Sequence, residues 1–213
     1  MKVNRKKIIL TSLITLLPLA VGLLLWNRLP DTIAPHFGPD GQADGWSSKP
    51  FAVFFIPLFL LAMHLLCVFV TAADPKRRNI GDKPLGLVYW IVPMASLLVG
   101  ILTYSIALGA ELNVNFFMSL VLGLLLIVIG NYLPKCRQNY TVGIKTPWTL
   151  NDPDNWNRTH RFAGRLGIAG GVIVMCNAFL DSVWIIVASI FIMAFVPIAY
   201  SYGLYRRSLD GET

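Results

Sequence analysis

The residues best suited to chemistry lie in a polar stretch between positions 134 and 162. His160 follows Asp152 and Asp154 closely in the sequence, and a histidine oriented by a carboxylate can act as a general base. The stretch contains no serine, and Cys136 lies 24 positions before the histidine. Since no nucleophile has a defined spacing to His160, the sequence favours a protein that is not an enzyme.

Common catalytic patterns are also missing. The chain has no G-x-S-x-G, no H-E-x-x-H and no Walker glycine loop. We therefore expect no catalytic residues. An enzyme that alters a lipid or a peptide stays open as an alternative.

A second candidate for chemistry is the run from Asp40 to Gly45, which begins like a calcium-binding loop. The twelfth position of that pattern should be a bidentate Glu but is Phe51. Turn-forming carboxylates explain the run more simply; the alternative is a metal held by His36 with Asp40 or Asp44. The sequence predicts no metal site and no cofactor.

The cysteines do not point to a disulfide framework or a metal site. Cys67 and Cys176 lie inside apolar segments, and Cys136 lies in the polar stretch. No pair has the spacing of metal ligands.

The composition indicates which elements must position these residues. The chain of 213 residues is 55% hydrophobic and only 14% charged, too little charge to cover a soluble globule of this size. A membrane-spanning helix needs roughly 20 mostly apolar residues. Six segments come near that length: 8–26, 51–73, 86–108, 116–133, 163–180 and 183–204. The sequence predicts an all-α integral membrane protein with six transmembrane helices in a single membrane domain, 1–213.

The distribution of basic residues predicts the orientation. Alternate loops hold 16 and 2 of the 18 Lys and Arg residues, and basic loops favour the cytoplasm. Both termini and the stretch 134–162 are therefore expected in the cytoplasm, and the loop 29–50 outside. The net charge of +7 then reflects topology and contact with membrane lipids rather than direct nucleic acid binding.

The amino-terminal half offers three further expectations. The segment 8–26 is longer than a usual signal-peptide core and is interpreted as an uncleaved helix, kinked at Pro18. The prolines and glycines of the loop 29–50 favour successive turns rather than a helix or a long strand. His64 lies inside the second span without an acidic partner, which favours a neutral histidine bonded to a neighbouring helix over a proton relay.

The stretch 134–162 is expected to end in a short helix that lies in the membrane interface before the fifth span. Asp154 can cap a helix beginning near Asn155. Trp148 and Trp156 are interpreted as interfacial anchors, with recognition of a protein partner as the alternative.

Small residues predict close helix packing in the second half of the chain. Ala163, Gly167 and Gly171 repeat at four-residue spacing, and Gly123 and Gly130 share one helical face. Such rows allow a neighbouring helix to approach closely.

Two motifs resemble a known family. The run 139–150 (NYTVGIKTPWTL), Trp156 and the run 159–164 (THRFAG) resemble the signature of the SdpI family of bacterial immunity proteins. The run 29–37 (LPDTIAPHF) with Gly41, Gly45 and Lys49 resembles the small domain of unknown function that commonly precedes this signature.

The resemblance implies protection against a secreted, membrane-active toxin peptide, the sporulation-delaying peptide in the family's named case. It also implies, for some members, a receptor that holds a winged-helix autorepressor at the membrane. The cytoplasmic motif residues are Gly143, Lys145, Thr146, Pro147, Trp148, Trp156, Arg161 and Phe162. The outer motif residues, expected to contact the toxin, are Pro35, His36, Gly41 and Lys49.

The leading hypothesis is therefore an immunity protein of the bacterial cytoplasmic membrane, and toxin sensing is a second role under the same hypothesis. A transporter or exporter of a peptide or small solute is the principal alternative, because proline-kinked spans and glycine rows also suit moving helices.

Overall fold

The computed structural model describes residues 4–211. Lys2, one of the 18 Lys and Arg residues whose distribution predicts the orientation, lies outside that range. The chain forms two compact units. We call residues 4–72 and 86–115 the hairpin unit, and residues 73–85 and 116–211 the signature unit.

The hairpin unit contains the first three predicted spans. Its elements are α1 (Arg5–Thr15), α2 (Leu17–Leu24), β1 (Thr32–Phe37), β2 (Ala43–Ser48), the π-helix η1 (Phe51–Phe55), α3 (Ile56–Ala73) and α4 (Asp82–Ala107). The helix of the first span breaks at Leu16 between α1 and α2, just before Pro18. Proline lacks the N–H that would continue the ladder, so the predicted kink is confirmed.

The loop 29–50 is not a series of turns, and that expectation was wrong. It forms an antiparallel β-hairpin of two six-residue strands, in which Thr32 pairs with Ser48 and Phe37 with Ala43. Pro35 falls between Ile33 and His36, where the register is irregular. Proline is tolerated at such a position because no ladder N–H is needed there.

The buried face of the hairpin explains why it is ordered. Leu29, Ile33, Ala52, Val53 and Tyr104 form one core cluster. Because these residues come from the hairpin, its flanks and α4, burying them fixes the hairpin against the helical part of the same unit.

His64 bonds to a neighbouring helix of this unit, as expected. Its ring is fully buried, and Nε2 lies 2.9 Å from Thr11 Oγ1 on α1.

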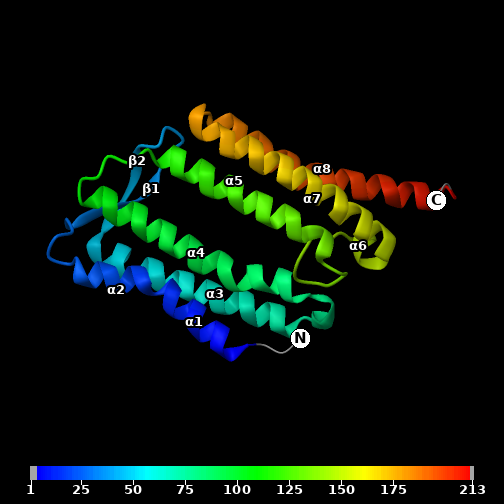
Figure 1. Cartoon of the computed structure of the whole chain (residues 1–213), viewed down its shortest axis with the longest axis horizontal. Coiled ribbons are helices and arrows are strands. Elements are labelled where there is room, and N and C mark those ends of the chain that lie inside the picture. The colour runs from blue at the N-terminus through cyan, green and yellow to red at the C-terminus, as the bar shows by residue number, and fades with distance from the viewer. Residues whose placement is uncertain (1–3, 212–213) are drawn as a thin grey trace. The chain divides into compact units, whose positions relative to one another are not determined.

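The signature unit contains the last three spans and the polar stretch. Its elements are the 3-10 helix η2 (Arg77–Asn79), α5 (Val114–Tyr132), the 3-10 helix η3 (Leu133–Lys135), α6 (Pro147–Asn151), α7 (Pro153–Cys176), the 3-10 helix η4 (Asn177–Phe179) and α8 (Val183–Leu209). The first two residues of α5, Val114 and Asn115, still belong to the hairpin unit. α7 and α8 run side by side, with the short α6 near one end of the pair (Figure 1).

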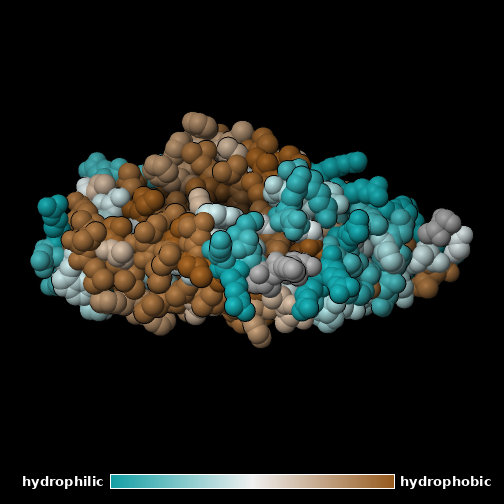
Figure 2. Space-filling view, turned by 60° about the horizontal axis from the view of Figure 1, so that its bottom comes forward, coloured by the Kyte–Doolittle hydropathy of each residue, from teal (hydrophilic) through white to brown (hydrophobic). Residues whose placement is uncertain are grey.

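Six helical segments within residues 4–211 are long and apolar enough to cross a membrane, as predicted. They are Arg5–Leu24, Phe51–Ala73, Asp82–Ala107, Val114–Lys135, Pro153–Phe179 and Val183–Leu209. Apolar side chains cover a broad part of the visible face, and hydrophilic residues gather apart from them (Figure 2). Exposed apolar area of this extent suits a lipid environment rather than water.

The fifth span begins earlier than expected. The segment assigned to a separate interfacial helix is continuous with the span in α7, from Pro153 to Cys176. The N-cap is Asp152, whose side chain accepts from the backbone N–H of Asp154 at 2.8 Å. The prediction of Asp154 as the cap was therefore wrong, because Pro153 favours the first helical position and places the cap just before itself.

Candidate functional site

The loop between η3 and α6 is built around the side chain of Asn139, which is fully buried. Its Oδ1 accepts from the backbone N–H groups of Thr141 and Val142, at 2.9 and 2.6 Å. Its Nδ2 donates to the carbonyls of Arg137 and Val142, at 2.8 and 2.9 Å. An asparagine bonded in this way imposes a turn on the backbone around it.

Asp74 joins this loop to the short connection that follows α3. Its Oδ2 accepts from the backbone N–H of Tyr140 at 2.9 Å and from Thr141 Oγ1 at 2.8 Å. Its Oδ1 accepts from the backbone N–H of Lys76 at 2.7 Å. With 3% of its surface exposed, the carboxylate is held by three donors. No sequence pattern in this connection predicts a role beyond orientation, so Asp74 was not among the predicted site residues.

Gln138 makes a second link between the same two segments. Its Oε1 accepts from Lys76 Nζ at 2.9 Å, and its backbone carbonyl accepts from Asn79 Nδ2 at 2.8 Å. Its Nε2 donates to the carbonyls of Thr149 and Leu150 in α6, at 2.9 and 2.8 Å. The connection after α3, the loop and α6 thus form one hydrogen-bonded assembly.

Gly143 lies directly against α7. Its φ of +119° is a conformation that side chains rarely adopt. A Cβ at this position would overlap His160 Nε2 and lie 3.1 Å from the indole of Trp156. The motif therefore needs glycine here for two independent reasons.

Trp156 and His160 form the surface that receives this loop. Their rings stack with centroids 4.0 Å apart, and Trp156 Nε1 donates to the carbonyl of Cys136 at 2.7 Å. Trp156 is fully buried, so its interpretation as an interfacial anchor was wrong. The ring holds the loop from inside.

The bonds of His160 assign its tautomer. Nε2 accepts from the backbone N–H of Ile144 at 3.0 Å, so Nδ1 carries the proton and donates to the carbonyl of Trp156 at 2.8 Å. The carboxylates considered as its partners are engaged elsewhere: Asp152 caps α7, and Asp154 lies 3.6 Å from Arg158. Both ring nitrogens of His160 are thus hydrogen-bonded to the backbone.

The Cys136 thiol is unsuited to nucleophilic attack. Only 4% of the residue is exposed, and Sγ lies 3.6 Å from the carbonyl of Tyr132. Burial raises the pKa of the thiol from 9.0 to about 11. The reactive thiolate is therefore scarce near neutral pH.

The short helix α6 begins with a capping box. The Thr146 side chain accepts from the backbone N–H of Thr149, and Thr149 Oγ1 accepts from that of Thr146 at 2.9 Å. Pro147 occupies the first helical turn. The ring of Trp148 packs on α8, with centroids 5.4 Å from Tyr202 and 5.9 Å from Tyr205.

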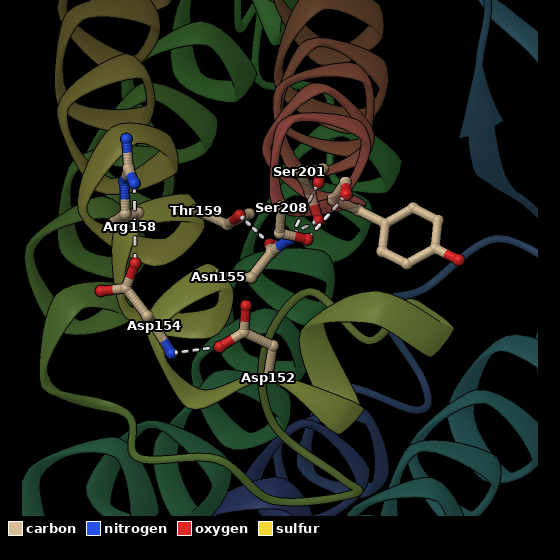
Figure 3. Close-up of polar contacts among 8 residues, drawn as sticks. Asp152, Asp154, Asn155, Arg158, Thr159, Ser201 and Ser208 are labelled. Carbon is tan, nitrogen blue, oxygen red and sulfur yellow. Dashed lines mark hydrogen bonds and ion pairs between the residues drawn. The ribbon is translucent and has the colours of Figure 1, made fainter. Parts of the chain in front are cut away.

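A buried polar cluster joins α7 to α8 (Figure 3). Asn155 Nδ2 donates to the carbonyl of Ser201 at 2.9 Å, and its Oδ1 accepts from Ser201 Oγ at 2.9 Å. The same Oδ1 accepts from Thr159 Oγ1 at 3.0 Å. Figure 3 shows the amide of Asn155 pointing across to α8, whereas Asp152 and Asp154 bond at the start of α7.

The remaining cytoplasmic motif residues differ in how far their side chains are exposed. Lys145 and Arg161 are exposed. Lys145 Nζ donates to the carbonyl of Thr141 at 2.8 Å. Phe162 stacks on Tyr200 of α8 with centroids 4.5 Å apart. Lys145, Pro147 and Arg161 form what we call the exposed motif face, whereas Gly143 and Trp156 lie beneath it.

The small residues bring α5 and α7 into backbone contact. A Cβ on Gly171 would lie 2.6 Å from the carbonyl oxygen of Gly123, and one on Gly167 would lie 3.0 Å from Gly130 Cα. Gly164, which the predicted row did not include, would place a Cβ 2.6 Å from the carbonyl oxygen of Gly130. Ala163 is buried beside this row.

The outer motif residues lie in or beside the hairpin. His36 pairs with Asp44 across the strands at 2.5 Å, and Gly41 adopts a φ of +73° in the turn. Lys49 Nζ lies 3.1 Å from Asp31 and donates to the carbonyl of Trp26 at 3.3 Å. Since only 11% of its side chain is exposed, Lys49 mainly ties the base of the hairpin to the end of the first span.

Comparison with known proteins agrees with this division. The SdpI/YfhL protein family matches residues 135–201, which hold the loop, α6, α7 and most of α8. A domain of unknown function, DUF1648, matches residues 13–61, which include the hairpin. Immunity protein SdpI of Bacillus subtilis (strain 168) is 26% identical over 214 residues, covering 97% of this chain and 99% of that protein. No solved structure matches the chain.

The chain thus resembles the SdpI/YfhL family in its carboxy-terminal third and an SdpI immunity protein along nearly its whole length. Its six apolar helices and this similarity make it a multi-pass protein of the bacterial cytoplasmic membrane. Most of the signature residues fold the polar stretch onto α7 and α8, and only a few face outward.

Proposed function

We propose that this protein is a membrane immunity protein that protects a bacterium from a secreted antimicrobial peptide. The observation that carries the proposal is the similarity to a protein named Immunity protein SdpI over nearly the full length of both chains. Because that alignment includes the hairpin and the signature loop alike, it concerns the whole architecture rather than one shared segment.

The protein acts by binding rather than by catalysis. Two features support this: both nitrogens of His160 are bonded within the fold, and the pKa of the Cys136 thiol lies well above neutrality. Recovery of the toxin in chemically altered form after incubation with the purified protein would contradict this part of the proposal.

The toxin meets the outer side of the protein. In the hairpin unit, Asn115 beside the α4–α5 connection donates to the carbonyl of Pro39 in the hairpin turn at 3.2 Å. Both loops therefore lie at the same end of that unit, and the distribution of basic residues favours an outward-facing position for this end. Lipids surround the apolar helices.

The exposed motif face docks a winged-helix repressor on the cytoplasmic side when toxin is bound. Lys145 and Arg161 offer exposed cationic groups, which steer association with an acidic partner surface. The buried motif residues keep these side chains in place.

The immunity proposal is tested by survival of a toxin-sensitive strain with and without the protein. Cells receive a dilution series of the sporulation-delaying peptide and, separately, of unrelated membrane-active peptides. Protection against the sporulation-delaying peptide alone supports specific immunity. Equal killing with the protein inserted in the membrane contradicts it, and protection that disappears when the proton-motive force is dissipated favours an exporter.

The sensing proposal is tested with a fluorescent fusion of the repressor. The fusion should move to the membrane when toxin is added to cells with the wild-type protein. It should stay in the cytoplasm with the variants Lys145→Ala and Arg161→Ala. Arg207→Ala, at the exposed end of α8, is the matched control and should behave as wild type. Recruitment that is equal in all four proteins would contradict the role given to the exposed motif face.

A further inference from the structure

An open pocket of about 430 Å³ lies in the hairpin unit, between the hairpin and the connection from α4 to α5. Phe37, Gln42 and Ala43 line it from the hairpin. Ile106, Glu111 and Leu112 line it from the end of α4 and the connection. Its volume is in the range of sites that bind small molecules or single peptide side chains.

The two walls of this pocket are tied to each other. Asn115 Nδ2 donates to the carbonyl of Pro39 at 3.2 Å. A Cβ built on Gly41 would lie 3.2 Å from the Asn115 side chain, so the turn and the start of α5 are in close contact.

The hairpin turn is also closed on itself. Gly38 N–H donates to the carbonyl of Gln42 at 2.8 Å, and Gln42 N–H donates to Asp40 Oδ1 at 3.0 Å. The pocket is thus formed before any ligand arrives, which lowers the entropic cost of binding.

The lining combines apolar side chains with one negative charge. Phe37, Ile106 and Leu112 supply apolar surface, and Glu111 is exposed. The lining residues include no Lys or Arg. A carboxylate beside apolar surface complements a cationic group that is flanked by apolar side chains. Membrane-active peptides commonly carry both kinds of residue, basic on one face and Trp, Phe or Leu on the other.

We propose that this pocket recognises the toxin peptide, with Glu111 facing a basic side chain or free amino terminus and Phe37 and Leu112 contacting the adjacent apolar residues. The proposal rests on the immunity function proposed above and assigns that function a binding site.

The test measures binding of fluorescently labelled sporulation-delaying peptide to the full-length protein in lipid nanodiscs. An exposed ion pair contributes up to about 1 kcal/mol, so Glu111→Gln should weaken binding about three- to fivefold. Glu111→Lys introduces repulsion and should weaken it more, by about tenfold or greater. Raising the salt concentration should weaken wild-type binding more than binding by Glu111→Gln.

The matched control is Asp181→Asn. Asp181 is an exposed carboxylate in the connection between α7 and α8, which the six-span topology places on the same side of the membrane. Its φ of 49° is one that asparagine tolerates. The variant loses the same charge on the same side but outside the pocket, and should bind the peptide as the wild type does.

A steric variant tests the pocket itself. Ala110 lines the pocket and is exposed, so Ala110→Trp fills space without disturbing a buried core and should abolish most binding at any salt concentration. If Glu111→Lys and Ala110→Trp bind the peptide as tightly as the wild type, the pocket is not the binding site, and the immunity function still stands. Failure of the wild type to bind the peptide would overturn the pocket, and failure to protect cells as well would overturn both proposals.

Discussion

The fold of the signature loop depends directly on the absence of a Cβ atom at Gly143. Its backbone has a φ of +119°, and the His160 ring occupies the space that a Cβ would need. The ring cannot move aside freely, because both of its nitrogens are bonded to the backbone.

Gly143→Ala should therefore destabilise the protein by about 2–4 kcal/mol, from backbone strain and overlap together. Gly109→Ala is the matched control: its φ is +91°, but nothing lies within 4 Å of the added Cβ. It should cost only about 1 kcal/mol, from strain alone. Thermal unfolding in nanodiscs measures both, and equal losses would show that the contact with His160 does not matter.

Asp74 is the second residue with a specific structural role. Its carboxylate accepts from three donors: the backbone N–H groups of Tyr140 and Lys76 and the hydroxyl of Thr141. Asp74→Asn replaces one acceptor oxygen with a donor and leaves a buried N–H without a partner, at a cost of about 2 kcal/mol.

Asp82→Asn is the control for Asp74→Asn, since Asp82 is exposed in the first turn of α4. It should lose less than about 1 kcal/mol, the usual contribution of a charge near a helix terminus. Limited proteolysis within residues 136–146 should accelerate only in Asp74→Asn. Unchanged proteolysis in that variant would contradict its role in holding the loop.

Sequence alone identified the motif positions but not how each one works. Gly143 and Trp156 were recognised by resemblance, yet their mutual contact depends on how the loop folds back onto α7. Asp74 was missed because its two partners in the signature loop are 66 and 67 positions away, beyond any local pattern. An acidic residue directly after a span, in an otherwise basic connection, was the signal available.

The crossing of α5 and α7 is the main packing feature at the scale of elements. Gly171 and Gly123 face each other so closely that an added Cβ would lie 2.6 Å from a carbonyl oxygen. In a membrane, where lipid is as apolar as the helix surface, such close backbone contact is a principal source of helix association.

Gly171→Ala should push these helices apart and cost about 2–3 kcal/mol. Gly203→Ala on α8 is the control, because nothing lies within 4 Å of its added Cβ. It should be neutral or stabilising by up to about 1 kcal/mol, since alanine is the better helix former. Thermal unfolding compares the two, and a loss in Gly203→Ala as large as in Gly171→Ala would refute the packing argument.

The sequence predicted the helices well, because spanning a bilayer sets strict requirements on length and hydropathy. The length and hydropathy needed to cross a bilayer gave six spans. The hairpin was missed because its prolines and glycines outweighed its β-forming residues in a local analysis. Its order depends on burying Ile33 against Val53 and Tyr104, a contact between distant segments.

At the scale of the whole molecule, the proposed function requires the hairpin and the signature loop to lie on opposite sides of the membrane. The prediction is tested in a cysteine-free background with two single-cysteine variants at exposed serines, Ser48→Cys in β2 and Ser208→Cys in α8. A membrane-impermeant maleimide should label Ser48→Cys in intact cells and Ser208→Cys only after permeabilisation. Labelling of Ser208→Cys alone in intact cells would show that the protein has the opposite orientation.

The central claim is immunity, and the most direct measurement is the dose of sporulation-delaying peptide that kills half of a sensitive culture. Strains with this protein and with an empty vector are compared, with membrane insertion verified in the first. We expect a clear increase in the killing dose for this peptide and no increase for unrelated membrane-active peptides. Coincident dose curves for the two strains would contradict it.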